Sequence, residues 1–480
     1  IQLQTPFGGG KTHSLLGLYH LFKEGEKLSH IDTVNKVKSL SRIDNIPNVK
    51  VAAFIGTHAN ALSDKTPWGE IADQLGVYEL MKKDDEARIA PGKAKILKML
   101  EKAGTSLILM DELMEYVVKS DRAEEVQNRV MGQTLAFLQE LTEAVATTKT
   151  SVLVLTLPAS TQVYDANAIH SLNKLQTVSG RVESIVQPVE GVEIYEVIRK
   201  RLFDSLGATK DHALVAQQYF SLYHELGESV PAEFKTTEYR SKIEKAYPFH
   251  PELIDTLYER WGSFSTFQRT RGVLRLLALA LGDLYEKRLP AGLIQSSMIP
   301  LDNSSVKREF IKHIGNEYDS VVAADIGEKG AKAPQIDREM GSEFAKQKIA
   351  TSLATAVFLY SFSGSGRKGL NIRELRITIL REGVPKTIVG DAVKKLEEEL
   401  WYFHSSNGMY SFKNQANLNR VIVDCEDQIT DDEVISELET ILKKQVGNDC
   451  ETFFWPKDPS DVPDTRKMKL VVMSPQMAHP

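Results

Sequence analysis

Short apolar runs alternate with longer amphipathic stretches in the N-terminal part of the chain. Three of these runs, at residues 49–57, 106–110 and 151–155, are almost wholly apolar. Continuous apolar runs of this length are typical of parallel strands covered by helices on both faces. The stretch at residues 122–147 between two of them carries apolar residues at helical spacing. The alternation predicts an α/β fold, with an open parallel sheet and helices on both faces.

The pattern changes after residue 202 and divides the rest of the chain into four parts. Residues 203–302 are almost entirely helical in pattern, whereas residues 303–344 are polar and predict an irregular linker. Residues 345–423 predict three helices and then two short strands joined at Ser406-Asn407-Gly408, which is typical of a winged helix-turn-helix domain. Residues 424–480 predict the start of a further α/β segment.

Composition narrows the class of protein. The chain has 480 residues, 42% hydrophobic and 26% charged, as expected of a soluble globular protein with several domains. No apolar run approaches the roughly 20 residues of a membrane helix. Two cysteines, Cys425 and Cys450, cannot build a disulfide framework. We therefore expect a cytoplasmic protein with no membrane contact. Because the chain opens inside a strand rather than at Met, we expect further sequence before it.

A glycine-rich segment, Pro-Phe-Gly-Gly-Gly-Lys-Thr-His, follows the strand predicted at residues 1–4. Glycines let backbone N–H groups wrap around an anion, and the helix predicted next directs the positive end of its dipole at it. Lys11 would reach the β- and γ-phosphates of a nucleotide, and Thr12 would ligate Mg²⁺. The expected nucleotide-binding residues are Phe7, Gly8, Gly9, Gly10, Lys11, Thr12 and His13. The segment departs from G-x-x-x-x-G-K-[ST] at Thr5, and a plain glycine-rich turn is the alternative.

The apolar strand at residues 106–110 runs directly into Asp111 and Glu112. Asp111 would hold Mg²⁺ through its water shell, and Glu112 would orient and deprotonate the attacking water. The alternative is that the two acids cap the helix that follows. Thr156 ends the next strand and would lie between the acidic pair and the γ-phosphate, unless it only terminates that strand. Since parallel sheets bind ligands at the carboxyl ends of their strands, these segments predict a site for ATP and Mg²⁺.

Two arginines follow in positions that resemble those of AAA+ ATPases. Arg181 stands after Gly180 and before a short strand, Pro188 and the helix at residues 194–202. By this resemblance Arg181 is an arginine finger, which stabilises charge at a neighbouring subunit's γ-phosphate; a surface arginine capping a turn is the alternative. Arg275 resembles the arginine of an AAA+ lid that folds over the nucleotide. Its alternative is a structural pairing with a nearby acid such as Asp283.

These motifs together resemble a prokaryotic group of large AAA+ ATPases, related to the origin-recognition and STAND branches. Members share the glycine-rich text, a strand ending Asp-Glu-Leu and a Phe-Gln-Arg-Thr-Arg-Gly-Val-Leu-Arg lid. They occur in phage-defence loci of BREX and Pgl type, beside DNA methyltransferases. The resemblance covers residues 1–202, the expected P-loop ATPase core, and the helical lid to about residue 300.

The resemblance implies a Mg²⁺-dependent ATPase that remodels or regulates a DNA-associated defence complex. It also implies partners, either copies of the same chain in a homo-oligomer or other proteins of the defence complex. Two other functions stay open: an ATP-gated switch or scaffold with little turnover, and an ATP-dependent DNA-binding regulator.

The predicted winged helix raises the question of DNA contact. The net charge of −6 provides no general attraction to nucleic acid, so binding needs a local basic patch. The third predicted helix carries Lys386, Lys394 and Lys395, but also Asp391 and three consecutive glutamates at residues 397–399. Carboxylates facing phosphates weaken binding. The sequence therefore favours protein docking by this domain over reading of DNA, and DNA contact remains the alternative.

Overall fold

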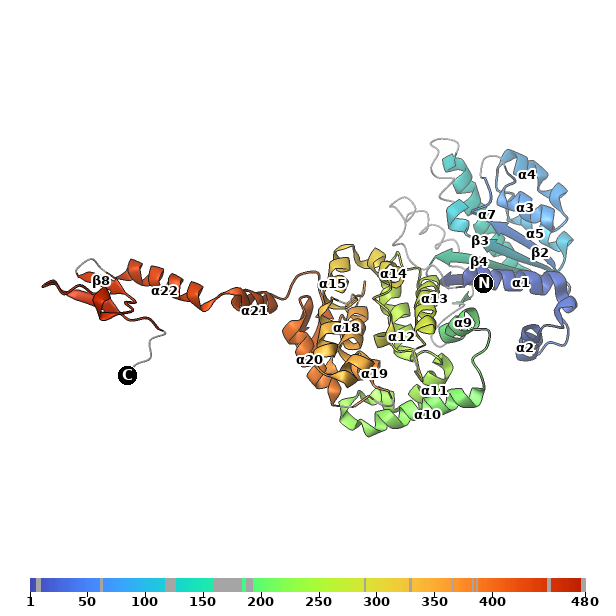
Figure 1. Ribbon diagram of the computed structural model, residues 1–480. Helices are drawn as coiled ribbons and strands as arrows, with labels where there is room; N and C mark the ends of the chain where they lie inside the picture. The colour runs from blue at the N-terminus through green and yellow to red at the C-terminus, as the bar shows by residue number, and fades with distance from the viewer. Residues whose placement is uncertain are drawn as a thin grey trace.

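The computed structural model divides the chain into an N-terminal sheet domain, a helical body and a C-terminal arm (Figure 1). It describes residues 1–5, 10–60, 64–116, 127–158, 184–186, 193–288, 291–327, 330–364, 366–381, 384–385, 387–446 and 450–475. Among these residues, no helix combines the length and the apolar character needed to cross a membrane.

The sheet domain is built on five strands in the order β2-β3-β4-β1-β5, and their pairings are parallel. They are β1 (Gln2–Thr5), β2 (Lys50–Ile55), β3 (Ser106–Asp111), β4 (Ser151–Pro158) and β5 (Ile185–Val186). The predicted parallel sheet is therefore confirmed. Its order leaves β4 as the one strand between β1 and β3, so the carboxyl ends of those two strands lie about 10 Å apart.

Helices cover both faces of this sheet, as Figure 1 shows. One face carries α1 (Lys11–Glu24), and the other carries α3 (Pro67–Gln74), α5 (Lys93–Ala103) and α7 (Gln127–Thr147). Side chains of β3 alternate between the two faces. Leu107 and Leu109 pack with Leu15 of α1, whereas Ile108 and Met110 pack with the core on the other face. Burial on both faces explains why the strand is continuously apolar. Two short helices, α2 (Asp32–Ser41) and α4 (Lys82–Ala87), also belong to the described part of this domain.

The helical body begins at α9 and includes the residues predicted to be an irregular linker. Its first helices are α9 (Glu193–Leu202), α10 (Thr209–Glu225), α11 (Thr237–Ala246), α12 (Pro251–Asp255) and α13 (Arg269–Lys287). Then follow α14 (Ser304–Ile314), α15 (Glu317–Asp325), α16 (Lys332–Glu339) and α17 (Ser342–Gln347). The prediction of irregular structure over residues 303–344 is therefore wrong. Sparse apolar residues such as Val306, Phe310 and Val322 lie at helical spacing and are buried, and the polar remainder covers the surface.

The predicted three helices and hairpin are present next along the chain. They are α18 (Ile349–Tyr360), α19 (Ile372–Ile379), α20 (Ile388–Glu399), β6 (Phe403–Ser406) and β7 (Met409–Phe412). Strands β6 and β7 pair antiparallel, and Leu370 forms a further antiparallel bridge with Tyr410.

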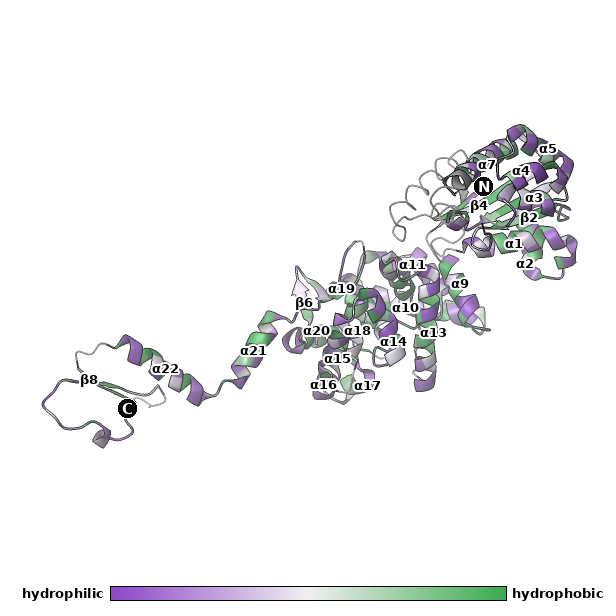
Figure 2. Cartoon of the chain, turned by 90° about the horizontal axis from the view of Figure 1, so that it is seen from above, coloured by the Kyte–Doolittle hydropathy of each residue, from purple (hydrophilic) through white to green (hydrophobic). Residues whose placement is uncertain are grey.

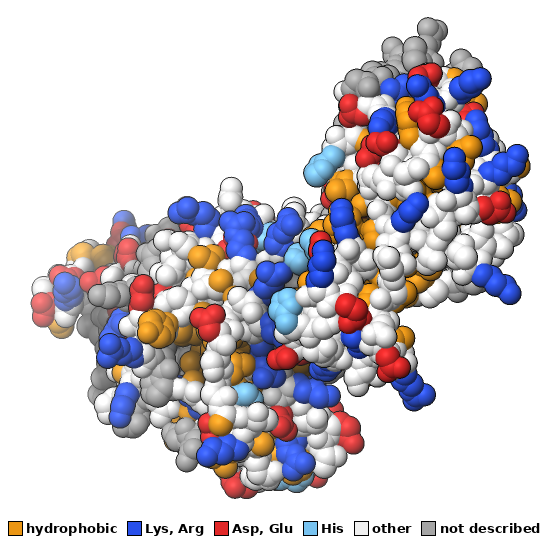
Figure 3. Space-filling model, turned by 90° about the vertical axis from the view of Figure 1, so that its right-hand side faces the viewer, with side chains coloured by type: hydrophobic (Ala, Val, Ile, Leu, Met, Phe, Trp, Pro, Cys, Tyr) orange, Lys and Arg blue, Asp and Glu red, His pale blue; other side chains and the backbone are white. Residues whose placement is uncertain are grey.

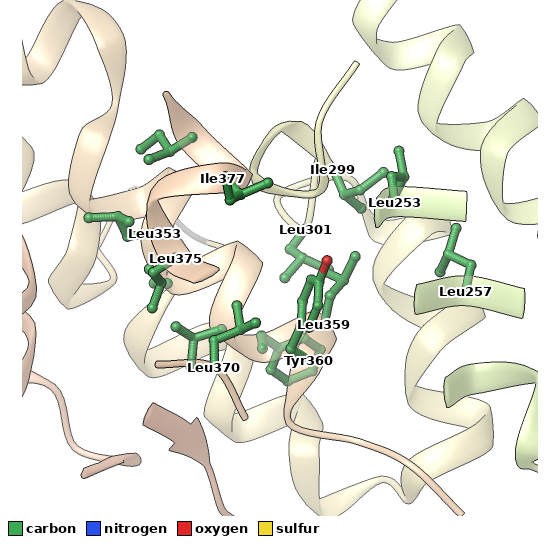
Figure 4. Close-up of a cluster of buried hydrophobic side chains, with 14 of the residues drawn as sticks. Leu253, Leu257, Ile299, Leu301, Leu353, Leu359, Tyr360, Leu370, Leu375 and Ile377 are labelled. Atoms are coloured by element: carbon green, nitrogen blue, oxygen red, sulfur yellow. The ribbon is translucent and has the colours of Figure 1, made fainter. Parts of the chain in front are cut away.

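One hydrophobic core runs through the whole helical body, from Ile194 to Phe412. Figure 4 shows part of it, where Leu253, Leu257, Ile299 and Leu301 lie beside Leu353, Leu359, Tyr360, Leu370, Leu375 and Ile377. The indole nitrogen of Trp261 also donates to the carbonyl oxygen of Leu359 at 2.8 Å. Residues 193–288 and the helix–hairpin segment therefore pack as one body.

The C-terminal arm extends away from this body in both views (Figures 1 and 2). It contains α21 (Leu418–Gln428), α22 (Asp431–Gln445), β8 (Glu451–Phe454) and β9 (Lys469–Val472). Strands β8 and β9 pair in parallel.

The helical body contains a mostly buried carboxylate, Glu252, at the start of α12. It accepts a hydrogen bond from the hydroxyl of Tyr239 at 3.2 Å. Burial, reinforced by the nearby charge of Asp255, raises the pKa of Glu252 to about 7. Between that value and the ordinary glutamate pKa of about 4.3, the folded chain binds a proton that the unfolded chain does not.

We predict that Glu252 makes folding more favourable as pH falls through 7. Its contribution to the free energy of unfolding should rise by about 2–3 kcal/mol between pH 8 and 5, and Glu252→Gln should abolish this part. His250 and His313 contribute in the opposite direction, because burial lowers their pKa values to about 3 and about 4. Their contributions to the free energy of unfolding fall as the pH falls. Urea unfolding of both proteins over this pH range isolates Glu252 as the difference between them. A pH-independent difference contradicts the assignment.

Candidate active site

Helix α1 begins at Lys11 with an open N-terminus. Gly10 precedes it with φ 81°, and its carbonyl oxygen accepts from the backbone N–H of Ser14 at 2.9 Å and from the Ser14 hydroxyl at 3.1 Å. No acidic residue lies in the first turn, and no side chain caps it. The first backbone N–H groups therefore point out of the helix, where they favour an anion. Phe7, Gly8 and Gly9 lie outside the described residues.

Asp111 ends β3 as a buried carboxylate at the carboxyl edge of the sheet. Its Oδ1 accepts from the hydroxyl of Thr156 at 2.7 Å and from the backbone N–H of Glu112 at 3.0 Å. Thr156 belongs to β4, which lies between the strands that carry Asp111 and the glycine-rich segment. Both described hydrogen bonds are accepted by Oδ1, and together they fix the orientation of the carboxylate. Thr156 thus positions Asp111.

Glu112 adopts a left-handed backbone conformation, with φ 51°, and its side chain is exposed. Its Oε2 accepts from the hydroxyl of Thr57 at 2.6 Å. Thr57 follows β2, and the turn there packs directly on Glu112: a Cβ at Gly56 would lie 2.2 Å from the Glu112 carbonyl oxygen. The Gly56 N–H also donates to the Asp111 carbonyl at 2.9 Å. The end of β2 therefore fixes both the backbone and the side chain of Glu112.

Thr57 is a candidate functional residue that the motifs of the sequence do not predict. The available signal was its position as a polar residue at the carboxyl end of a predicted strand, the same signal that identified Asp111 and Thr156.

Lys11 lies close to the acidic pair. Burial lowers the pKa of its amine, and the negative charges of Asp111 and Glu112 oppose that shift. A half-buried ammonium facing two carboxylates is typical of sites where a bound anion and metal separate the charges. The structure thus brings together Lys11 at the start of helix α1, Asp111 and Glu112 at the end of β3, and Thr156 of β4.

The oxygen groups present here suit Mg²⁺, which prefers carboxylate and hydroxyl donors and keeps much of its water. Asp111 supplies a carboxylate, and Thr12 supplies an exposed hydroxyl in the first turn of α1. Within the described part of the chain, no group of three or more His, Cys, Asp or Glu side chains is arranged to hold a metal. These residues therefore fit a magnesium ion bound largely through phosphate oxygens and water.

His13 links the glycine-rich segment to the helical body. Its Nε2 lies 2.9 Å from a terminal guanidinium nitrogen of Arg201, at the end of α9. Since arginine only donates, His13 accepts through Nε2. Blue Lys and Arg side chains and pale-blue His side chains intermingle where the sheet domain meets the helical body (Figure 3).

The two arginines expected to sense or stabilise the γ-phosphate differ in what the structure describes. Arg181 lies outside the described residues. Arg275 lies in α13, where its Nε is 3.1 Å from Oε2 of Glu309, a buried acid of α14. Asp283, the acid considered for this pairing, binds Lys287 at 2.7 Å instead. The Arg275 side chain remains 64% exposed.

Two models of one protein family match the chain. The model of the DUF499 N-terminal domain matches residues 1–194, and the model of the DUF499 second domain matches residues 190–383. No curated protein matches the chain. Among solved structures, the Walker-type ATPase PABY2304 of Pyrococcus abyssi aligns over 86% of this chain and 87% of its own, at 11% identity. Its TM-score of 0.23 is too low to support an argument.

We predict that Gly56→Ala disturbs the Glu112 turn and lowers the free energy of unfolding by about 1–3 kcal/mol, because the added methyl group overlaps a backbone carbonyl. Gly17→Ala is the matched control: apart from the backbone of helix α1 itself, no atom of the described residues lies within 4 Å of a Cβ at that position. It should stabilise the chain by up to about 1 kcal/mol through helix propensity. Chemical unfolding measures both, and equal effects of the two changes contradict the close approach at Gly56.

Proposed function

We propose that this chain, a member of the DUF499 family through residues 1–383, binds ATP with Mg²⁺ and hydrolyses it. The observation that carries the proposal is the meeting of Lys11 with Asp111 and Glu112 at one edge of the sheet. The ends of β1 and β3, which lead to the cation and to the acidic pair, are about 10 Å apart by strand spacing, which suits a phosphate chain and its metal.

Each residue of the site has a distinct role in the proposal. Lys11 and the N–H groups of α1 bind phosphate oxygens, and Thr12 and Asp111 hold the metal. Bound Mg²⁺ would neutralise charge on the phosphates. Glu112 accepts the proton of the attacking water through Oε1, because Thr57 already binds Oε2. Thr156 keeps Asp111 oriented through its hydroxyl.

The roles of Arg181 and Arg275 toward the γ-phosphate rest on the AAA+ resemblance, and the role of Thr156 rests on its position at the carboxyl end of β4. Thr156 lies next to the acidic pair and is placed to sense the phosphate indirectly, through Asp111. Arg181 acts on a neighbouring subunit, so its role requires a homo-oligomer. Arg275 contacts Glu309 through Nε, which leaves its terminal nitrogens on a mostly exposed side chain. That orientation suits an arginine presented to a phosphate.

Work on a DNA-associated defence complex is proposed on the family resemblance alone. The exposed face of α20 carries Lys394 and Lys395 together with Asp391 and Glu398. Mixed charge favours a protein partner over DNA for this helix. An ATP-gated switch with little turnover is the second candidate. Steady-state ATPase rates with and without DNA separate the two, because a remodelling enzyme accelerates on its substrate.

We predict that Glu112→Gln stops turnover while ATP still binds. The amide keeps the size of the side chain but removes the base, so kcat should fall by about 100-fold or more and the Kd for ATP should change little. Glu115→Gln, three residues further along, is the control and should leave both values unchanged. Equal loss of binding and turnover in Glu112→Gln contradicts a role as base.

We also predict that Thr57 acts as a positioning residue for Glu112. Thr57→Val keeps the shape of the side chain but removes the hydroxyl that holds Oε2, so kcat should fall by about 10-fold with ATP affinity unchanged. Thr57→Ser retains the hydroxyl and should restore most of the activity. Steady-state kinetics and equilibrium nucleotide binding provide the two readouts. Equal activity of the Val and Ser variants rules out positioning through this hydrogen bond.

A further inference from the structure

Exposed apolar side chains are concentrated on the C-terminal arm, defined here as residues 418–475. Eleven of the 23 large apolar side chains that are exposed in the described part of the chain lie on it. The arm is a small fraction of the chain and stands away from the helical body (Figures 1 and 2). Scattered exposed apolar residues are ordinary, but a concentration of them marks an interaction surface.

Helix α22 carries the most regular part of this surface. Val434, Leu438 and Ile441 are 46%, 37% and 45% exposed. Their spacing of i, i+4 and i+7 places them in one stripe along the helix. Ile435 and Leu442, on the adjoining side, are half-buried. The stripe is therefore an apolar helix face that the described part of the chain leaves open to solvent.

The charges of α22 divide between its two ends. Its first turn contains Asp431, Asp432 and Glu433, and its last turn contains Lys443 and Lys444. Glu433 is engaged in a capping box with Thr430, and Lys443 binds Glu439 at 2.6 Å. This distribution complements the helix dipole. It also makes the helix self-complementary, because an antiparallel copy brings the acids of one against the lysines of the other.

We propose that α22 is a self-association surface, on which a second copy of this chain docks antiparallel. In that arrangement Leu438 lies near the two-fold axis, and Val434 of one copy faces Ile441 of the other. Asp431 and Asp432 then face the partner's lysines at the other end of a helix about 22 Å long. A single pair of helices buries little area, so we expect a dissociation constant in the micromolar range. The proposal does not depend on nucleotide binding.

Sedimentation of the full chain without nucleotide tests the charge arrangement. The wild-type chain should show a concentration-dependent monomer–dimer equilibrium that high salt weakens. Asp431→Lys with Asp432→Lys should lower the association at least 10-fold, and so should Lys443→Glu with Lys444→Glu. An equimolar mixture of the two variants should associate again, because each end then meets an opposite charge. This recovery excludes simple loss of the helix as the cause.

Cross-linking tests the register in a background where Cys425 and Cys450 are replaced by Ser. Leu438→Cys should form a disulfide between copies. Val434→Cys alone should not, but it should cross-link to Ile441→Cys when the two variants are mixed. A chain that stays monomeric throughout the micromolar concentration range overturns the proposal. So does a mixture of charge variants that fails to associate. Either result means that another segment or another protein covers the stripe.

Discussion

One ammonium and two carboxylates approach each other at the carboxyl edge of a parallel sheet, and the proposed site rests on this approach. Lys11 is half-buried, so water alone does not screen its charge from Asp111 and Glu112. The strand order produces this approach, because only β4 lies between β1, which precedes Lys11, and β3, which ends in Asp111. Asp111 of β3 and Thr156 of β4 then lie near Lys11 of helix α1, whose N-terminus favours an anion.

The site is held by hydrogen bonds that cross between strands. Thr156 of β4 binds the carboxylate of Asp111, and Thr57 after β2 binds that of Glu112. Each threonine hydroxyl donates to one oxygen of the carboxylate that it contacts. The result is an acidic pair whose orientation is fixed before any ligand arrives, and preorganisation of this kind lowers the cost of reaching the reactive arrangement.

Much of this arrangement was predictable from the sequence, and the reasons for the failures are physical. Buried parallel strands are continuously apolar, so residues 106–110 and 151–155 were recognised together with the polar residues that end them. Thr57 has the same position at the carboxyl end of a strand, but the sequence does not show that its hydroxyl binds Glu112, because that contact depends on the pairing of β2 with β3. The helices of residues 303–344 were missed because few apolar residues suffice for a helix at the edge of a large core. The single core from Ile194 to Phe412 depends on long-range packing.

The most direct test of the central claim is calorimetric titration of the chain with ATP, in the presence and absence of Mg²⁺. The account predicts binding that is tighter with Mg²⁺. It also predicts that Lys11→Ala weakens this binding by 10-fold or more, because the loss of a charged contact costs about 1.4 kcal/mol or above. The circular dichroism and the unfolding of this variant should be unchanged. ATP binding that is unaffected by Lys11→Ala would contradict it.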